Sequence, residues 1–288
     1  NSGKPRSETF EKISFDPALA GVHDVLLADV DGDGQSDVIT MSDKNNLRWY
    51  RISEDPRQLW ARHDIGLPVH AGVGVGDLDG DGDLDVVRSN LWFENRDGRG
   101  TEWTVQENIP FGNPNHPYPL GTHCEVVDLD CDGDNDLVMV ENEIKGGRAG
   151  WLENVDSLGG EWNLHQFPRG DRDTRGAYHS LVVADFDNDG DPDICSCEME
   201  GIPGDRPPRW FVWENQDGKG QQFAEHVILD NNLGSHLAVA ADVDGDGDVD
   251  LVGKLWRPRK DNANQGRNHI DFLENLLIDK DKAGENRS

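Results

Sequence analysis

The stretch DVDGDGQSD, residues 29–37, decides the fold, because closely similar stretches recur four more times along the chain. Each copy has Asp at positions 1, 3, 5 and 9 and Gly at position 6, and the copies are called loops 1 to 5 below. Their starts are 48, 51, 57 and 57 residues apart, a period typical of architectures with one supersecondary unit per repeat. Loops 2 to 5 are DLDGDGDLD (77–85), DLDCDGDND (128–136), DFDNDGDPD (185–193) and DVDGDGDVD (242–250).

The Asp spacing is that of a calcium-binding loop, in which side chains at positions 1, 3 and 5 and a carbonyl at position 7 converge on the ion. An EF-hand would need Glu at position 12, which here holds Thr40, Arg88, Met139, Ser196 and Gly253. We therefore predict about five structural Ca²⁺ ions, each between two strands; Asp-Gly turns without metal are the alternative. The predicted ligands are Asp29, Asp31, Asp33, Asp37, Asp77, Asp79, Asp81, Asp85, Asp128, Asp130, Asp132, Asp136, Asp185, Asp187, Asp189, Asp193, Asp242, Asp244, Asp246 and Asp250.

The loops also account for most of the excess of acidic over basic residues. The 288 residues carry 57 acidic and 27 basic side chains, a formal net charge of -30, and 24 of the acidic residues are Asp within the loops. Such an acid excess repels phosphate backbones, so no nucleic-acid partner is expected. No apolar run approaches ~18 residues, so no membrane span is expected. Calcium modules of ~0.1–1 mM affinity, and a chain beginning at Asn1 rather than Met, favour a secreted or periplasmic protein.

A second repeated motif defines the rest of each unit. LRWYRI (47–52), LWFEN (91–95), GWLEN (150–154), FVWEN (211–215) and DFLEN (271–275) each follow a loop, and several continue through a Gly/Asp turn into a further strand. Four strands per repeat predict an all-β, five-bladed β-propeller, with residues 1–288 as a single domain. The blades are expected to begin near residues 22, 69, 121, 178 and 235. The last repeat lacks a fourth strand, and residues 8–15 (ETFEKISF) are expected to supply it and close the ring.

The five Asp loops make the sequence resemble the FG-GAP/VCBS family of calcium-binding propeller repeats, over essentially the whole chain. That family includes integrin heads, some lectins, and carbohydrate-active lyases and dehydratases. GRAGWLENVDSLGGEW (147–162) is also similar, more weakly, to blade sequence of aldos-2-ulose dehydratase and polysaccharide lyase propellers. The resemblance implies a calcium-stabilised propeller with a carbohydrate ligand or substrate. Relatives often have seven or eight blades, so five blades would be a departure.

A histidine precedes each loop by five to seven residues, on the face opposite calcium where the longest loops also lie. These residues, His23, His70, His123, His179 and His236, are expected to surround the mouth of the central channel. They predict either a divalent transition metal held by imidazoles or general acid–base catalysis; a structural histidine copied by duplication is the alternative. Because a one-residue offset reverses side-chain direction on a strand, His23, His179 and His236 are the best candidates. Glu125 is a further candidate ligand or base.

The same face carries unusual positive charge for this protein, since residues 254–269 hold five Lys/Arg and one Asp. Arg binds carboxylates bidentately and aromatic rings stack on sugars, so an acidic sugar such as a uronate is the expected ligand. Solvated loops that balance nearby acid are the alternative for any single Arg. The candidate substrate-binding residues are Arg257, Arg259, Trp256, Arg209, Tyr118 and His116.

These residues predict a carbohydrate lyase or dehydratase-like enzyme with one central site. His179, His236 or His23 would act as the base, and Tyr178 as an acid. A lectin or adhesion module without catalysis is the alternative, and it would repeat its site from blade to blade. A protein-interaction scaffold is a third reading.

Overall fold

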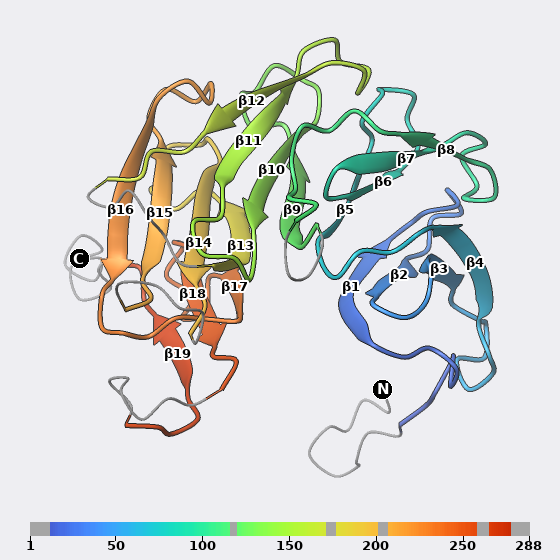
Figure 1. The fold of residues 1–288 in the computed structure, drawn as a ribbon, viewed down its shortest axis with the longest axis horizontal. Helices are drawn as coiled ribbons and strands as arrows, with labels where there is room; N and C mark the ends of the chain where they lie inside the picture. The colour runs from blue at the N-terminus through green and yellow to red at the C-terminus, as the bar shows by residue number, and fades with distance from the viewer. Residues whose placement is uncertain (1–11, 116–119, 171–176, 201–206, 258–264, 278–288) are drawn as a thin grey trace, which may run out of the picture.

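Five antiparallel sheets surround a common centre in the computed structural model, which describes residues 12–115, 120–170, 177–200, 207–257 and 265–277 (Figure 1). All regular elements among these residues are strands. Each sheet is one blade, its strands follow chain order, and its first strand faces the middle of the molecule (Figure 1). The predicted five-bladed β-propeller is therefore confirmed. None of the described residues forms a helix able to cross a membrane.

Four blades have four strands and the fifth has three within the described residues. The first comprises β1 (Val22–Ala28), β2 (Asp37–Ser42), β3 (Leu47–Arg51) and β4 (Ala61–Gly66), and the second β5 (Val73–Gly76), β6 (Asp85–Arg88), β7 (Leu91–Asn95) and β8 (Trp103–Gln106). The third comprises β9 (Thr122–Val127), β10 (Asp136–Glu141), β11 (Ala149–Asn154) and β12 (Trp162–Gln166). The fourth and fifth comprise β13 (Tyr178–Ala184), β14 (Asp193–Glu198), β15 (Trp210–Asn215), β16 (Phe223–Leu229), β17 (Leu237–Ala241), β18 (Asp250–Lys254) and β19 (Ile270–Leu273).

The Asp at position 9 of each loop sets the register of its blade. It begins the second strand and pairs with the last residue of the first strand, as in Val127↔Asp136 and Ala184↔Asp193. In loops 2 to 5 its buried carboxylate accepts from two backbone amides; Asp136, for example, accepts from Leu129 at 3.0 Å and from Asn154 at 2.9 Å. The same residue thus joins the loop to the second and third strands, which explains why position 9 is Asp in every copy.

The Asn that ends the third strand connects each blade to the one before it. Asn215 donates from Nδ2 to the Leu129 carbonyl of the preceding blade at 3.2 Å and accepts from the Gly220 amide at 3.1 Å. Equivalent bonds run from Asn95 to Val30, from Asn154 to Leu78 and from Asn275 to Phe186. The first blade has Ile52 at this position, so it lacks the Asn that would make this link.

Apolar side chains fill the four interfaces between consecutive blades. Trp side chains of the third strands contribute most, because Trp49, Trp92 and Trp151 are almost fully buried. Trp151 donates from Nε1 to the Gly220 carbonyl in the next blade at 3.1 Å. Gly220 has φ +64°, and a Cβ there would lie 2.5 Å from Trp151, so only glycine fits this turn.

The expected closing strand is only partly within the described residues. Residues 8–11 lie outside them, and residues 12–15 form no strand. Phe15 instead stacks on Trp60, with ring centroids 4.1 Å apart, and makes an edge contact with Tyr50 of β3. The second half of the predicted strand is therefore wrong, since burial against the first blade holds Phe15 there. Ring closure by residues 8–11 stays a prediction.

Candidate functional site

Five histidines gather at the centre of the propeller, one from each blade. The rings of His179 and His236 stack with centroids 3.9 Å apart, and His123 lies 5.2 Å from His179. His23 lies 4.5 Å from His70 and 6.4 Å from His236, so the cluster spans the first and fifth blades as well. The sequence prediction that these residues share one location agrees with the structure. The expectation that a one-residue offset separates His70 and His123 from the rest is wrong.

Two β-bulges explain why histidines at different distances from their Asp loops still lie together, although strict alternation along a strand would separate them. The pairing of β1 with β2 shifts between Val22 and Asp24, and the pairing of β13 with β14 shifts between Tyr178 and Ser180. His23 and His179 therefore occupy the extra positions. A bulge re-aims a side chain locally, and bulges occur often beside functional sites. Simple alternation along a strand therefore could not anticipate that His70 and His123 lie with them.

Glu143 completes the cluster, and sequence reasoning missed it. It lies two residues beyond β10, in the connection to β11, with φ 51°. Its Oε1 is 3.4 Å from His179 Nε2, and its Oε2 is 3.4 Å from His70 Nε2. A non-glycine residue at positive φ costs free energy and is enriched at functional sites. Glu143 belongs to no repeated motif, which is why the repeat pattern gave no signal for it.

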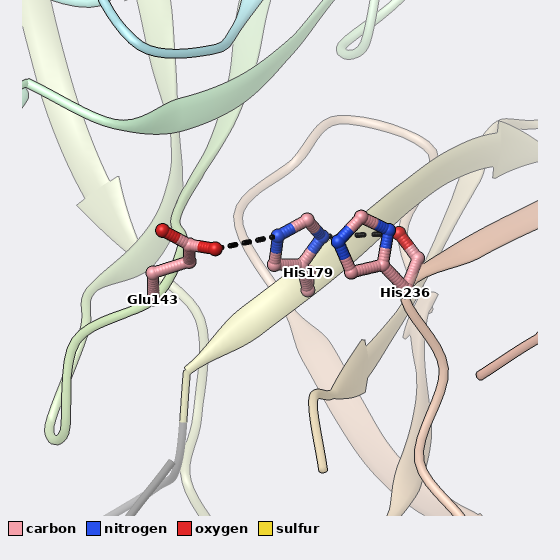
Figure 2. Close-up of side chains that lie close together, drawn as sticks. All are labelled: Glu143, His179 and His236. Carbon is pink, nitrogen blue, oxygen red and sulfur yellow. Dashed lines mark hydrogen bonds and ion pairs between the residues drawn. The ribbon is translucent and has the colours of Figure 1, made fainter. Parts of the chain in front are cut away.

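The hydrogen bonds of His179 fix the state of its ring. Figure 2 shows Glu143 on one side of His179 and the His236 backbone carbonyl on the other. His179 Nδ1 lies 3.0 Å from that carbonyl oxygen, which only accepts, so Nδ1 carries the proton. The other ring nitrogen, Nε2, therefore faces the Glu143 carboxylate. Two electron-rich atoms face each other stably only if a proton or a metal ion neutralises the contact.

The residues around His179 are held in defined charge states. Burial raises the pKa of the Glu143 carboxyl, but hydrogen bonds from His179 and His70 outweigh this effect and hold that pKa well below its usual range. The hydrogen bond to Glu143 raises the pKa of His70. Burial, followed by the charge of His179, lowers the pKa values of His123 and His236 to about 3, so both are neutral. A carboxylate beside neutral imidazoles is a ligand set that suits Zn²⁺ or Fe²⁺.

The three atoms best placed to bind one metal ion come from Glu143, His179 and His236, and they lie within 4.8 Å of one another. His179 Nε2 and Glu143 Oε2 are buried, and among the described residues the long 3.4 Å contacts given above are the polar contacts that they make. The Nδ1–H of His179 is bound to a backbone carbonyl, the arrangement that orients metal-binding histidines. The residues present therefore fit a divalent transition metal. Glu143 takes the place that the sequence assigned to His23.

His23 has a different environment from the other histidines. Its Nδ1 lies 3.2 Å from Asp24 Oδ1, and its Nε2 forms no hydrogen bond to the described residues. Asp24 is fixed in turn by the Gly72 amide at 2.6 Å. Burial raises the pKa of Asp24, but the hydrogen bond from His23 and other interactions bring it below the ordinary value. An ionised carboxylate thus orients an imidazole whose second nitrogen is available for proton transfer.

Three other candidates differ from their expected roles. Tyr178 is fully buried against Phe211 and Trp213, because it neighbours the bulge residue His179 and lies within the core between the third and fourth blades. Arg209 is only 2% exposed, and its guanidinium lies 5.0 Å from the Phe211 ring centroid. The assignments of Tyr178 as an acid and Arg209 as a substrate ligand are therefore not supported. The Glu125 side chain is exposed, but the surrounding protein partly desolvates its carboxyl group, and this desolvation raises its pKa to about 7.

Two predicted substrate-binding residues do lie beside the cluster. The Trp256 ring is 6.3 Å from His236 at an interplanar angle of 20°, and it is 43% exposed. The Arg257 guanidinium lies 4.1 Å from the Trp256 ring centroid. An exposed aromatic face with a cation next to it borders the imidazoles. His116, Tyr118 and Arg259 lie outside the described residues.

The Asp loops are separate from this cluster, at the opposite ends of the inner strands. In loops 2, 3 and 4 the carboxylates at positions 1, 3 and 9 come within 4.8 Å of one another: Asp77, Asp79 and Asp85, then Asp128, Asp130 and Asp136, then Asp185, Asp187 and Asp193. In loop 1 the converging set is Asp29, Asp31 and Asp33. These groups fit a hard divalent cation with oxygen ligands. Calcium binding by the twenty predicted Asp stays a prediction.

Comparison with known proteins agrees with the repeat and the fold. The FG-GAP-like repeat model matches residues 17–87 and 128–196. The chain is thus a β-propeller that contains FG-GAP-like repeats in the matched segments. No curated protein sequence matches it significantly. A lectin from Agrocybe aegerita that recognises non-reducing terminal N-acetylglucosamine shares the fold, with 19% identity and a TM-score of 0.52 over 90% of this chain and 67% of the lectin.

Two further solved structures are more distant. The rhamnogalacturonan lyase PL11 of Bacillus licheniformis has 16% identity and a TM-score of 0.45, and the match covers 90% of this FG-GAP-repeat chain and 51% of the lyase. The exo-inulinase of Aspergillus awamori has 16% identity and a TM-score of 0.45 over 89% of this chain and 62% of the inulinase. This FG-GAP-repeat propeller thus spans about half of the lyase and less than two thirds of the inulinase.

Proposed function

We propose that this propeller is a secreted, carbohydrate-acting enzyme with one central site, which cleaves an acidic sugar polymer by lyase chemistry. The observation that carries the proposal is the convergence of Glu143, His179 and His236, beside the oriented pair His23–Asp24. The site brings together side chains from all five blades, with a carboxylate that no other blade repeats. The exposed Trp256–Arg257 pair at its edge supplies a stacking face and a carboxylate-binding cation.

The residues divide into binding and proton-transfer roles. Glu143, His179 and His236 would hold a divalent transition metal, and such an ion would supply positive charge beside the substrate carboxylate. Arg257 binds the same acidic group or its neighbour in the polymer. His23 is the base, because Asp24 fixes its Nδ1 and leaves Nε2 to accept a proton. His70 is the acid, since its raised pKa favours the protonated ring.

A base and an acid in these positions account for both proton transfers of a β-elimination next to a uronate carboxylate. His23 accepts the proton from C5 of the sugar, and the C4–O bond breaks as the C4=C5 double bond forms. His70 donates a proton to the departing oxygen. The ring centroids of His23 and His70 are 4.5 Å apart, so acid and base act on adjacent atoms of one sugar. The products are a shortened chain and an unsaturated uronate.

The test is turnover on a panel of uronate-containing polysaccharides, followed by ultraviolet absorbance of the new conjugated double bond. We expect wild type to be active on at least one of them and His23→Ala to lose about 10²-fold or more in kcat. His226→Ala is the matched control, because His226 lies on the outer strand of the fourth blade and pairs with Glu214. If His23→Ala and His226→Ala were equally active on every substrate, the proposed base would be wrong.

A lectin is the second candidate, and one observation favours it. Hollows recur at equivalent positions between blades: one of about 270 Å³ includes Asp31, Trp49 and His63, and one of about 230 Å³ includes Asp79, Trp92 and Gln106. A carboxylate beside a Trp edge is a plausible neutral-sugar site. Titration calorimetry with neutral and acidic oligosaccharides separates the two functions. Several equivalent sites that survive His179→Ala favour the lectin, and one site lost in that variant favours the enzyme.

A further inference from the structure

The third strand of each blade presents one side chain to its Asp loop, and the first blade differs from the others. The second to fifth blades have Glu94, Glu153, Glu214 and Glu274 at this position. Asp79 and Glu94 line the same hollow, as do Asp187 and Glu214. The first blade has Arg51 in the equivalent place, where it lines a hollow with Asp31. One repeat therefore presents a cation where four repeats present an anion.

The Arg51 guanidinium reaches the acidic groups of loop 1. Its Nη2 lies 3.0 Å from Asp33 Oδ2 and also contacts Asp31 Oδ2. The Asp31 side chain is only 6% exposed, so this pair is shielded on the Asp side even though Arg51 is about half exposed. Positions 3 and 5 are two of the three side-chain positions that calcium would need in this loop. A positive group already occupies the space toward which both carboxylates point.

The carboxylates of loop 1 are also arranged differently. Positions 1, 3 and 5 converge in loop 1, whereas positions 1, 3 and 9 converge in loops 2 to 4. Position 7 is Gln35 in loop 1, but Asp83, Asp134, Asp191 and Asp248 in the other loops. Each of loops 2 to 5 thus combines five Asp with one Glu, a formal charge of -6. Loop 1 combines four Asp with Arg51, a formal charge of -3.

We propose that Arg51 replaces calcium in loop 1, so that the first blade holds its loop closed without the ion while the other four loops depend on it. The inference rests on calcium binding by loops 2 to 5 and is independent of the central site. The lower charge and the guanidinium both disfavour a divalent cation, and affinity at loop 1 falls by about 100-fold or more relative to the other loops. The first blade then stays folded at calcium concentrations that loosen the rest.

A first blade that stays folded without calcium fits its place in the ring. It lacks the Asn link to a preceding blade, because Ile52 replaces that residue, and Phe15 packs on its outer side. Arg51 also forms part of the hollow that receives Arg99 and Thr101 from the second blade. A blade that needs no ion gives the rest of the ring a folded partner on which to assemble.

Reciprocal exchange of the charges tests the proposal. Calcium bound per chain is measured by equilibrium dialysis of full-length protein at about 1 mM free calcium, for wild type, Arg51→Glu and Glu94→Arg. We expect four ions for wild type, five for Arg51→Glu and three for Glu94→Arg. Arg51→Lys keeps the positive charge and should bind four, which controls for loss of packing around the side chain.

The results that overturn the proposal are equally specific. Five ions in wild type, or no gain in Arg51→Glu, would show that the guanidinium does not exclude calcium. No calcium in any variant would remove the calcium assignment itself and the inference with it, but would leave the central site untouched. If Arg51→Glu folds poorly, terbium luminescence of Arg51→Gln supplies the second readout, with a gain of one site expected and no gain contradicting the proposal.

Discussion

Glu143 and His179 belong to different blades, and Glu143 Oε1 lies 3.4 Å from Nε2 of the histidine. Because His179 donates Nδ1–H to the His236 carbonyl, its other ring nitrogen, Nε2, is the one that faces the carboxylate. Two outcomes satisfy this contact, an imidazolium–carboxylate pair or a metal ion bound to both. The stacked His236 ring, which is neutral because burial lowers its pKa to about 3, supplies a third ligand and favours the metal.

Calcium removal should destabilise the propeller. At about 1 mM calcium and a Kd of ~0.1 mM, each occupied loop contributes about 1.4 kcal/mol to the free energy of unfolding. Chelation with EDTA should therefore lower Tm by more than ~5 °C, measured by circular dichroism. The same chelator added with excess calcium is the control. An unchanged Tm would contradict calcium binding by the Asp loops.

Gly220→Ala should weaken the contact between the third and fourth blades. Alanine at φ +64° costs about 1–2 kcal/mol, and the collision of its Cβ with Trp151 should bring the loss to about 3 kcal/mol. Gly146→Ala is the matched control, because Gly146 has φ +75° with nothing within 4 Å of the added Cβ. Urea unfolding of both variants in calcium measures the difference. Equal losses of unfolding free energy in the two variants would show that the Trp151 side chain moves away from the added Cβ without a free-energy cost.

Asn215→Ala should be destabilising for a different reason. It leaves the Leu129 carbonyl and the Gly220 amide without the Asn215 side chain, and each buried unsatisfied group costs about 1–3 kcal/mol. We expect a loss of about 2–4 kcal/mol in the free energy of unfolding. Asn163→Ala, on an outer strand, should cost less than about 1 kcal/mol. A loss no larger than in this control would mean that the link between blades is not stabilising.

Glu125→Gln should change the pH dependence of stability. Solvent reaches the Glu125 side chain, but desolvation by the surrounding protein raises its folded-state pKa to about 7, so the folded chain keeps a proton that the unfolded chain releases near pH 4.3. Ionisation of Glu125 therefore reduces stability progressively between about pH 4 and pH 7. Glu125→Gln removes this cost, and its Tm should exceed that of wild type above pH 7 and approach it at pH 4. A constant Tm difference across this range would contradict the raised pKa.

The sequence predicts features that depend on local spacing and repetition. Asp at positions 1, 3, 5 and 9 identified the turn between the first two strands of each blade, and the position 9 carboxylate does bind backbone amides of that blade, as Asp136 shows. The shared location of the five histidines was likewise readable, because each precedes its loop by a similar number of residues.

Features that depend on irregular backbone were not predictable. Bulges at His23 and His179 break the alternation from which side-chain direction is predicted, and Tyr178, beside the second bulge, lies in the core rather than at the site. Glu143 approaches the centre from a connection that no other blade repeats. A search for repeats finds what duplication copied, so a ligand contributed by a single blade gives it no signal.

The metal content of the central site tests the account most directly. Wild type and His179→Ala are dialysed in excess calcium with a small molar excess of Zn²⁺, and bound zinc is measured by elemental analysis. We predict one zinc ion per wild-type chain and none in His179→Ala, with unchanged calcium in both. No zinc in wild type, or equal zinc in both proteins, would contradict a metal site formed by Glu143, His179 and His236.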